Sequence, residues 1–201
     1  MKIIPPLLTV MLLAACVLTG CQSPKAMPPF EGSPAQATRN NCYSLLHQLL
    51  DEQKDVSILR FIKPEHSDLK KLVKKIATTS GTGATLLEEF AKDDPSISLD
   101  DIRLPPGELG TRDAIASTKE KELLSQTGDE CELTLLLTQT EALNYAWHLA
   151  KVAGENEPQT ERARALAGIS EDMKNLYHEV FGLLLSKTKS SATNLIRTQP
   201  N

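Results

Sequence analysis

The chain has 201 residues, with 22 Lys and Arg against 26 Asp and Glu and a formal net charge of −4. A mildly acidic chain of this kind is a poor candidate for binding nucleic acid or an anionic lipid surface through charge. Only 4% of the residues are aromatic, whereas Leu, Ala, Glu and Lys are abundant, which favours helices packed along aliphatic seams. About 180 residues follow the N-terminal apolar stretch, enough for one domain with a substantial core.

Residues 1–20 are predicted to be a secretory signal peptide. Lys2 supplies a positive charge, and residues 3–18 are uncharged and, with one threonine excepted, apolar. This run falls short of the roughly 20 apolar residues that span a membrane comfortably, and it ends in small residues, as secretory signals do. The alternative is an uncleaved anchor helix, which the short length and the Pro5-Pro6 pair disfavour.

The signal ends in the tetrapeptide LTGC at residues 18–21. This tetrapeptide resembles the lipobox of bacterial lipoproteins, a family in which the cysteine carries acyl chains such as palmitate and the signal is cut directly before it. Residues 13–16 (LAAC) fit the same pattern, so Cys16 is the alternative lipidation site. Cys21 is favoured because the apolar run continues past Cys16 and polar residues follow Cys21 at once.

The lipobox resemblance implies that the mature protein is held at a membrane by its lipid. Each buried CH₂ contributes about 0.8 kcal/mol, so several acyl chains together hold a protein firmly. Gln22 follows the cysteine, where an aspartate would resemble the inner-membrane retention signal. We therefore expect a cell-envelope protein at the outer membrane, facing the periplasm. Its partners would be the membrane itself and an envelope protein, and not a nucleic acid.

The rest of the chain divides into a tether, a domain and a tail. Residues 21–40 contain four prolines and little apolar content, which predicts a flexible tether between lipid and domain. Residues 41–186 are predicted to form a helical bundle domain, because apolar side chains recur there every three or four residues. Residues 187–201, rich in Ser, Thr and Asn, are predicted to be a disordered tail.

The apolar spacing within the domain predicts four long helices and one short one. The second long helix is predicted to continue through the weak helix-forming stretch 78–83, because its apolar face keeps the same phase on both sides. The short, charged helix is expected in the long connection before the third long helix. The four long helices are expected at about residues 41–62, 64–92, 129–154 and 158–186, and the short one at about 112–125.

These elements predict an all-α fold, a four-helix bundle. Short links are expected at residues 63–64 and 155–157, and a long connection between the second and third long helices. Two helical hairpins joined by one long crossover is a standard bundle topology. No alternating strand pattern competes with it.

The layout resembles the ferritin-like outer-membrane lipoproteins of unknown function, through the stretches 68–76 (DLKKLVKKI) and 128–133 (GDECEL). The resemblance implies a ferritin-like order of the helices. That family often carries an acid–histidine pair midway along the second and third helices, whereas residues 79–80 and 139–140 are Thr-Ser and Gln-Thr here. A di-metal site of this type also needs Glu-x-x-His motifs, and the sequence has none. We therefore expect no metal and no cofactor.

Three residues remain as candidates for a degenerate metal site, namely Glu52, Glu141 and His148. Glu52 is placed at the centre of the first helix's apolar seam, where an unpaired carboxylate would be costly. The ferritin-like resemblance implies a first-helix glutamate at this position. His148 is expected at the edge of the seam of the third long helix, two turns from Glu141. The alternative is that Glu52 pairs with an inward polar group such as Asn144.

Two side chains near these candidates have simpler interpretations. His47 falls nearly opposite the apolar seam of its helix, which predicts a solvated surface position. Trp147 is interpreted as a core side chain.

Cys42 and Cys131 would remain after signal removal and lipidation. An oxidising periplasm permits a disulfide between them. A ferritin-like order would place them at opposite ends of the bundle, so free thiols or an intermolecular bridge are favoured. A plain up-down-up-down bundle would allow the intramolecular bond.

Three functions remain open from the sequence. The favoured one is a non-catalytic envelope lipoprotein that acts structurally or by binding a partner. The second is a metal-binding ferritin-like bundle that uses the degenerate site. The third is a carrier of a small apolar ligand, for which the small residues Ser80 and Gly83 would leave room between the helices.

Overall fold

The computed structural model describes residues 32–56 and 66–197, with side chains described as far as residue 189. Cys16 and Cys21, and with them the predicted lipidation site, lie outside the described residues, as does the predicted link at 63–64. The described residues form five α-helices and no strand. The helices are α1 (Pro34–Lys54), α2 (Ser67–Asp93), α3 (Pro106–Ser125), α4 (Gly128–Glu155) and α5 (Thr160–Arg197).

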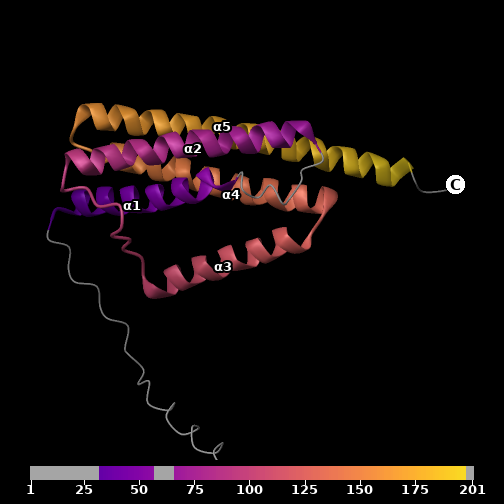
Figure 1. Ribbon diagram of the computed structural model, residues 1–201, viewed down its shortest axis with the longest axis horizontal. Helices are drawn as coiled ribbons and strands as arrows, with labels where there is room; N and C mark the ends of the chain where they lie inside the picture. Colours follow the sequence, from indigo (N-terminus) through magenta and orange to yellow (C-terminus); the bar gives the residue numbers. More distant parts are fainter. Residues whose placement is uncertain (1–31, 57–65, 198–201) are drawn as a thin grey trace, which may run out of the picture.

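The four long helices pack side by side as two pairs, and α3 lies apart from them at an angle (Figure 1). α1 packs against α2 and α4 packs against α5, while α1–α4 and α2–α5 contacts join the pairs. α3 belongs to the crossover between α2 and α4, and it packs only lightly on α4. The prediction of an all-α, bundle-like fold with a helix in its crossover is confirmed.

The predicted boundary between tether and domain was wrong, because α1 begins at Pro34 rather than near residue 41. Ser33 is the N-cap, and its side chain accepts a hydrogen bond from the Gln36 N–H at 3.2 Å. Proline suits the first helical turn because its missing N–H would have no partner there. The prolines of this segment indicated a tether, but one of them starts the helix.

Three further helix boundaries differ from the prediction. α1 ends at Lys54 rather than near residue 62. α3 begins at Pro106 rather than near residue 112, again with proline in the first turn. α5 continues to Arg197 instead of ending near residue 186, so the predicted tail is largely helical. Neither Gly nor Pro interrupts residues 187–197, and Lys187 is tied to α4 by an ion pair with the buried Glu132. The continuous second helix is confirmed, since α2 runs unbroken through residues 78–83.

The core consists mainly of aliphatic side chains from the four long helices, and Leu123 of α3 also belongs to it. Gly83 lets α1 and α2 approach closely, because a Cβ at this position would lie 3.0 Å from Leu50 Cδ1. No helix among the described residues is long and apolar enough to span a membrane. The largest fully buried side chains are Tyr43, Leu46, Leu50, Leu69, Ile76, Leu87, Leu135, Leu136, Leu143, Leu166, Met173 and Leu176.

Candidate functional site

The structure does not bring together the three residues predicted as a degenerate metal site. Glu52 is exposed and accepts a hydrogen bond from Gln48 Nε2 at 3.0 Å, so it does not lie in the helix seam. Glu141 and His148 are exposed on α4. The predicted position of Glu52 in the seam was wrong, because the seam of α1 passes through Tyr43, Leu46 and Leu50 and Glu52 therefore points outward. Asn144, its proposed partner, is also exposed.

The space predicted beside Ser80 and Gly83 is filled. Ser80 is fully buried, and its hydroxyl oxygen has no hydrogen-bond partner among the described residues. Leu50 Cδ1 and Ile169 Cδ1 lie 3.0 and 3.9 Å from where a Cβ on Gly83 would be. The main support for a carrier of a small apolar ligand is therefore lost.

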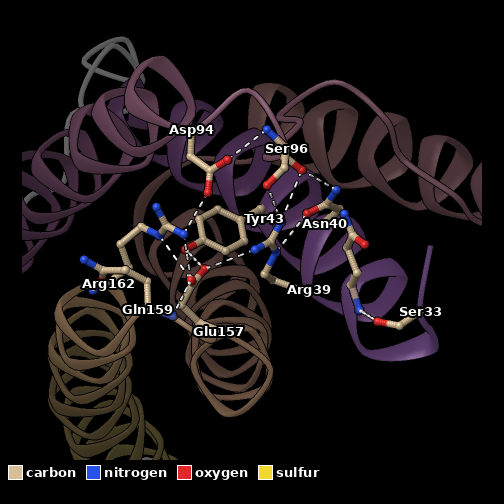
Figure 2. A network of polar contacts seen from close by, with 10 residues as sticks. Ser33, Arg39, Asn40, Tyr43, Asp94, Ser96, Glu157, Gln159 and Arg162 are labelled. Carbon is tan, nitrogen blue, oxygen red and sulfur yellow. Dashed lines mark hydrogen bonds and ion pairs between the residues drawn. The ribbon is translucent and has the colours of Figure 1, made fainter. Parts of the chain in front are cut away.

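A buried carboxylate, Glu157, occupies the end of the bundle where α4 connects to α5 (Figure 2). Its side chain is 0% exposed. It accepts hydrogen bonds from the Tyr43 hydroxyl at 2.9 Å and from Arg162 Nη2 and Nε at 2.9 and 3.1 Å. Arg39 Nη1 approaches from the other side at 3.9 Å. The carboxylate is thus neutralised by two arginines from different helices.

Further contacts tie this carboxylate to the segment after α2. Arg162 Nη2 lies 2.8 Å from Asp94 Oδ2. Arg39 Nη2 donates to the Ser96 carbonyl and hydroxyl oxygens at 3.2 and 3.1 Å, and Asn40 Nδ2 donates to the same carbonyl at 2.8 Å. The Glu157 network therefore joins the start of α1, the end of α2 and the α4–α5 link; its members are Arg39, Asn40, Tyr43, Asp94, Ser96, Glu157 and Arg162 (Figure 2).

The electrostatics of the Glu157 network favour a structural role. Burial, together with the hydrogen bond to Glu157, raises the pKa of the Tyr43 hydroxyl, which stays a neutral donor. Hydrogen bonds from Ser96 and the nearby Arg162 guanidinium lower the pKa of Asp94, which stays ionised. Two carboxyl groups and two guanidinium groups therefore face one another in this network.

The sequence interpretation missed this network. Arg39 lay within the predicted tether, and Glu157 lay in a predicted link. The Ser33-Pro34 helix start was the local signal that could have placed Arg39 on a helix.

A second buried carboxylate, Glu132, lies near the start of α4, at the other end of the bundle. It accepts a hydrogen bond from the His66 N–H at 3.2 Å, and its Oε2 lies 2.9 Å from His66 Nδ1. Lys187 of α5 forms an ion pair with it. Burial favours the neutral carboxyl, but the hydrogen bonds from Lys187 and His66 outweigh this effect and lower the pKa of Glu132. The ionised carboxylate therefore joins the starts of α2 and α4 to α5.

This Glu132 cluster (His66, Asp129, Glu132 and Lys187) has the side-chain types of a metal site, but it already holds a cation. One ligand atom from each of His66, Asp129 and Glu132 lies within 4.8 Å of the others. Lys187 Nζ lies 3.1 Å from His66 Nδ1 and 3.6 Å from Asp129 Oδ1, besides its contact with Glu132. The ammonium group thus contacts all three potential ligands.

A further group of three metal-ligating side chains lies between α1 and α2. It comprises His47, Asp51 and Glu88, again with one ligand atom each within 4.8 Å of the others. The prediction of a solvated His47 was wrong, because its side chain is only 18% exposed and its Nε2 lies 3.2 Å from Glu88 Oε1. His47 lies one turn from both Tyr43 and Leu50, so the observed seam of α1 brings its ring to the edge of the α1–α2 contact.

Cys42 and Cys131 are both free and buried. Cys42 precedes Tyr43, which contacts Glu157 just beyond the C-terminal end of α4, whereas Cys131 lies in the first turn of α4. Because α4 is about 40 Å long and a disulfide needs Cα atoms within about 7 Å, the two cannot bond to each other in this fold. Burial raises the pKa of both thiols, which opposes reaction with another molecule.

Aromatic rings gather on the outer side of α4 and α5. Trp147, predicted as core, packs on the core with part of its surface and stacks on His148 with a centroid distance of 4.5 Å. Tyr177 and Phe181 of α5 stack at 6.0 Å, and Tyr177 lies 6.2 Å from Trp147. Phe181 is 39% exposed. We call this surface the α4–α5 aromatic face; it consists of Trp147, His148, Tyr177, His178 and Phe181.

Comparison with known proteins supports the fold assignment. No protein-family model and no curated protein matches the chain. A crystal structure of a DUF305 protein from Streptomyces coelicolor, inferred to be secreted, matches with a TM-score of 0.57 and 20% identity, over 77% of this chain and 94% of that chain. A similarity at this level of identity concerns the fold and not the activity. The chain is therefore an all-helical protein whose fold is similar to that of a DUF305 protein.

Proposed function

We propose that this chain is a lipid-anchored protein of the cell envelope whose helical domain acts without catalysis, in a structural or partner-binding role. The anchor is Cys21, and the domain faces the periplasm from the outer membrane. The LTGC tetrapeptide at residues 18–21 and the apolar run before it support this address. In the same proposal the four long helices have a ferritin-like order, which the two helix pairs and the long crossover support.

One observation carries the non-catalytic part of the proposal. The two deeply buried carboxylates in the described part of the chain, Glu157 and Glu132, are bound to cationic side chains from other elements. A general acid or base needs a pKa near the working pH and access to a substrate. Glu132 stays ionised because its pKa is lowered, and the Glu157 side chain is fully buried between two arginines, so both carboxylates hold the ends of the bundle. In this proposal the domain acts through contacts made by its surface.

The α4–α5 aromatic face is the proposed contact surface, and its occupant is another envelope protein that presents apolar side chains. Aromatic residues are enriched where protein interfaces bury most energy, and Phe181 and Leu185 are 39% and 44% exposed here. Because α1 begins at Pro34, the tether comprises only residues 22–33, which reach at most about 40 Å when extended. The partner must therefore lie close to the membrane surface.

The anchor is tested by substitution of the two candidate cysteines. We expect Cys21→Ser to abolish incorporation of labelled palmitate and to release the protein from the membrane fraction. Cys16→Ser, the matched control, should retain both label and location. Retained label and membrane location in Cys21→Ser would contradict the proposed anchor.

The contact surface is tested by a photo-crosslinking amino acid at position 181 in cells. Position 172 is the matched control, since Asp172 is exposed on the same helix and nine residues away, on the opposite side at 100° per residue. We expect a discrete adduct with another envelope protein from position 181 and none from position 172. An adduct only with a second copy of the chain, or none from a folded and anchored protein, would contradict the proposed occupant.

A further inference from the structure

The group formed by His47, Asp51 and Glu88 lies where α1 and α2 pack together. His47 and Asp51 are four residues apart on α1, which places them on one side of the helix. Glu88 comes from the facing side of α2. His47 Nε2 and Glu88 Oε1 are 3.2 Å apart, and Asp51 contributes an oxygen within 4.8 Å of both.

The spacing of these atoms suits a small tetrahedral ion. Zinc binds imidazole nitrogen and carboxylate oxygen at about 2.0–2.2 Å, so two ligands of a tetrahedral site are about 3.3 Å apart. The 3.2 Å between His47 Nε2 and Glu88 Oε1 agrees with this distance between two ligands. The Asp51 carboxylate is 44% exposed, so a change of rotamer can complete the set.

The charges around the group are mainly negative. Asp51 and Glu88 belong to it, and Asp55 lies near enough, with them, to act on the charge of Lys54. Lys54 forms an ion pair with Asp51, but its side chain is 41% exposed. Exposed pairs of this kind contribute little to stability, so a divalent cation can displace the ammonium group.

The Glu132 cluster provides the contrast within the same chain. There, Lys187 contacts all three potential ligands and is itself largely covered, at 17% exposure. In the His47 group Lys54 forms an ion pair with Asp51, and Glu88 is near enough to act on the charge of Lys54. Two groups of similar composition therefore differ in how many of their potential ligands form a contact with a lysine, three in the Glu132 cluster and one in the His47 group.

We propose that His47, Asp51 and Glu88 form a binding site for a divalent transition-metal ion of the zinc type. Imidazole nitrogen is a preferred ligand of zinc, copper and nickel, whereas magnesium and calcium prefer sites made of oxygen atoms. Three protein ligands leave at least one coordination position open to water. The bound ion would fasten α1 to α2 and neutralise the two carboxylates, independently of any role of the α4–α5 aromatic face.

The test is titration of the untagged full-length protein with Zn²⁺ at pH 7.5, followed by calorimetry. We expect about one equivalent to bind, and we expect His47→Gln to weaken binding by at least tenfold. His66→Gln, the matched control from the Glu132 cluster, should leave the affinity unchanged. A tenfold excess of Mg²⁺ should not compete.

A second variant separates ligand loss from misfolding. The double variant Asp51→Asn with Glu88→Gln keeps the shapes of both side chains and removes their charges. Its affinity for Zn²⁺ should also fall at least tenfold, while its circular dichroism spectrum stays that of the wild type. The proposal is overturned if the wild type binds no Zn²⁺, or if His47→Gln binds as tightly as the wild type. Loss of affinity only in His66→Gln would assign the ion to the Glu132 cluster instead.

Discussion

Replacing Glu157 by glutamine removes one negative charge from the Glu157 network and keeps the shape of the side chain. Asp94 still pairs with Arg162, but Arg39, which is 4% exposed, loses its carboxylate. Removing one partner of a buried ion pair costs about 3–5 kcal/mol, because the other charge stays buried without compensation. The lower end applies here, because the amide oxygen can still accept from Tyr43. We therefore expect the free energy of unfolding to fall by about 3 kcal/mol.

Urea denaturation measures this change directly. With a slope near 2 kcal/mol per molar urea, 3 kcal/mol moves the midpoint down by about 1.5 M at unchanged slope. Glu161→Gln is the control, because the Arg164–Glu161 pair, within α5, is 69% and 75% exposed and such pairs contribute little. Equal midpoints for Glu157→Gln and Glu161→Gln would refute the assignment of Glu157 as a structural clamp.

Three more outcomes follow from the described contacts. The pKa of Glu132 lies below its ordinary value of 4.5, so its ionised form stabilises the fold above that pH, and this contribution is lost as the pH falls below 4.5. When the free energy of unfolding is measured against pH in the acid range, Glu132→Gln should lose less stability than the wild type, and an equal loss would contradict the ion pair. In thermal unfolding, Gly83→Val should destabilise the fold by about 1–3 kcal/mol through overpacking. Gly81→Ala, where a Cβ would have its nearest contact at 3.6 Å, should stabilise the fold by about 0.5–1 kcal/mol. A stabilising Gly83→Val would show that the α1–α2 contact is loose. Cys42 and Cys131 should react with a thiol reagent slowly in the native protein and fully in urea, and rapid native labelling would disprove their burial.

The helical elements were predictable because their signals are local. The expected helix at 129–154 is observed as Gly128–Glu155, and its start coincides with the positive φ of Gly128, a conformation that glycine adopts without strain. The continuity of α2 through residues 78–83 was also predicted, because the apolar side chains keep the same helical phase before and after this stretch. The start of α1 was missed, since prolines indicate a tether when the N-cap at Ser33 is not weighed.

The site residues were harder to predict because their pairings are distant in the sequence. Tyr43 and Glu157 are 114 residues apart, and His66 and Glu132 are 66 residues apart. No periodicity links such positions. The error at Glu52 has a different cause, since rotating the seam of a helix by one position turns a buried side chain outward. The error at His47 has this cause too, because His47 lies one turn from Tyr43 and Leu50 and therefore at the edge of the observed seam.

The mass of the mature protein's N-terminal peptide, measured after detergent extraction from the membrane, tests the central claim most directly. The proposal predicts a chain that begins at Cys21 and carries acyl chains on that residue. An N-terminal peptide without acyl chains, or one that retains residues 1–20, would contradict a lipid-anchored envelope protein.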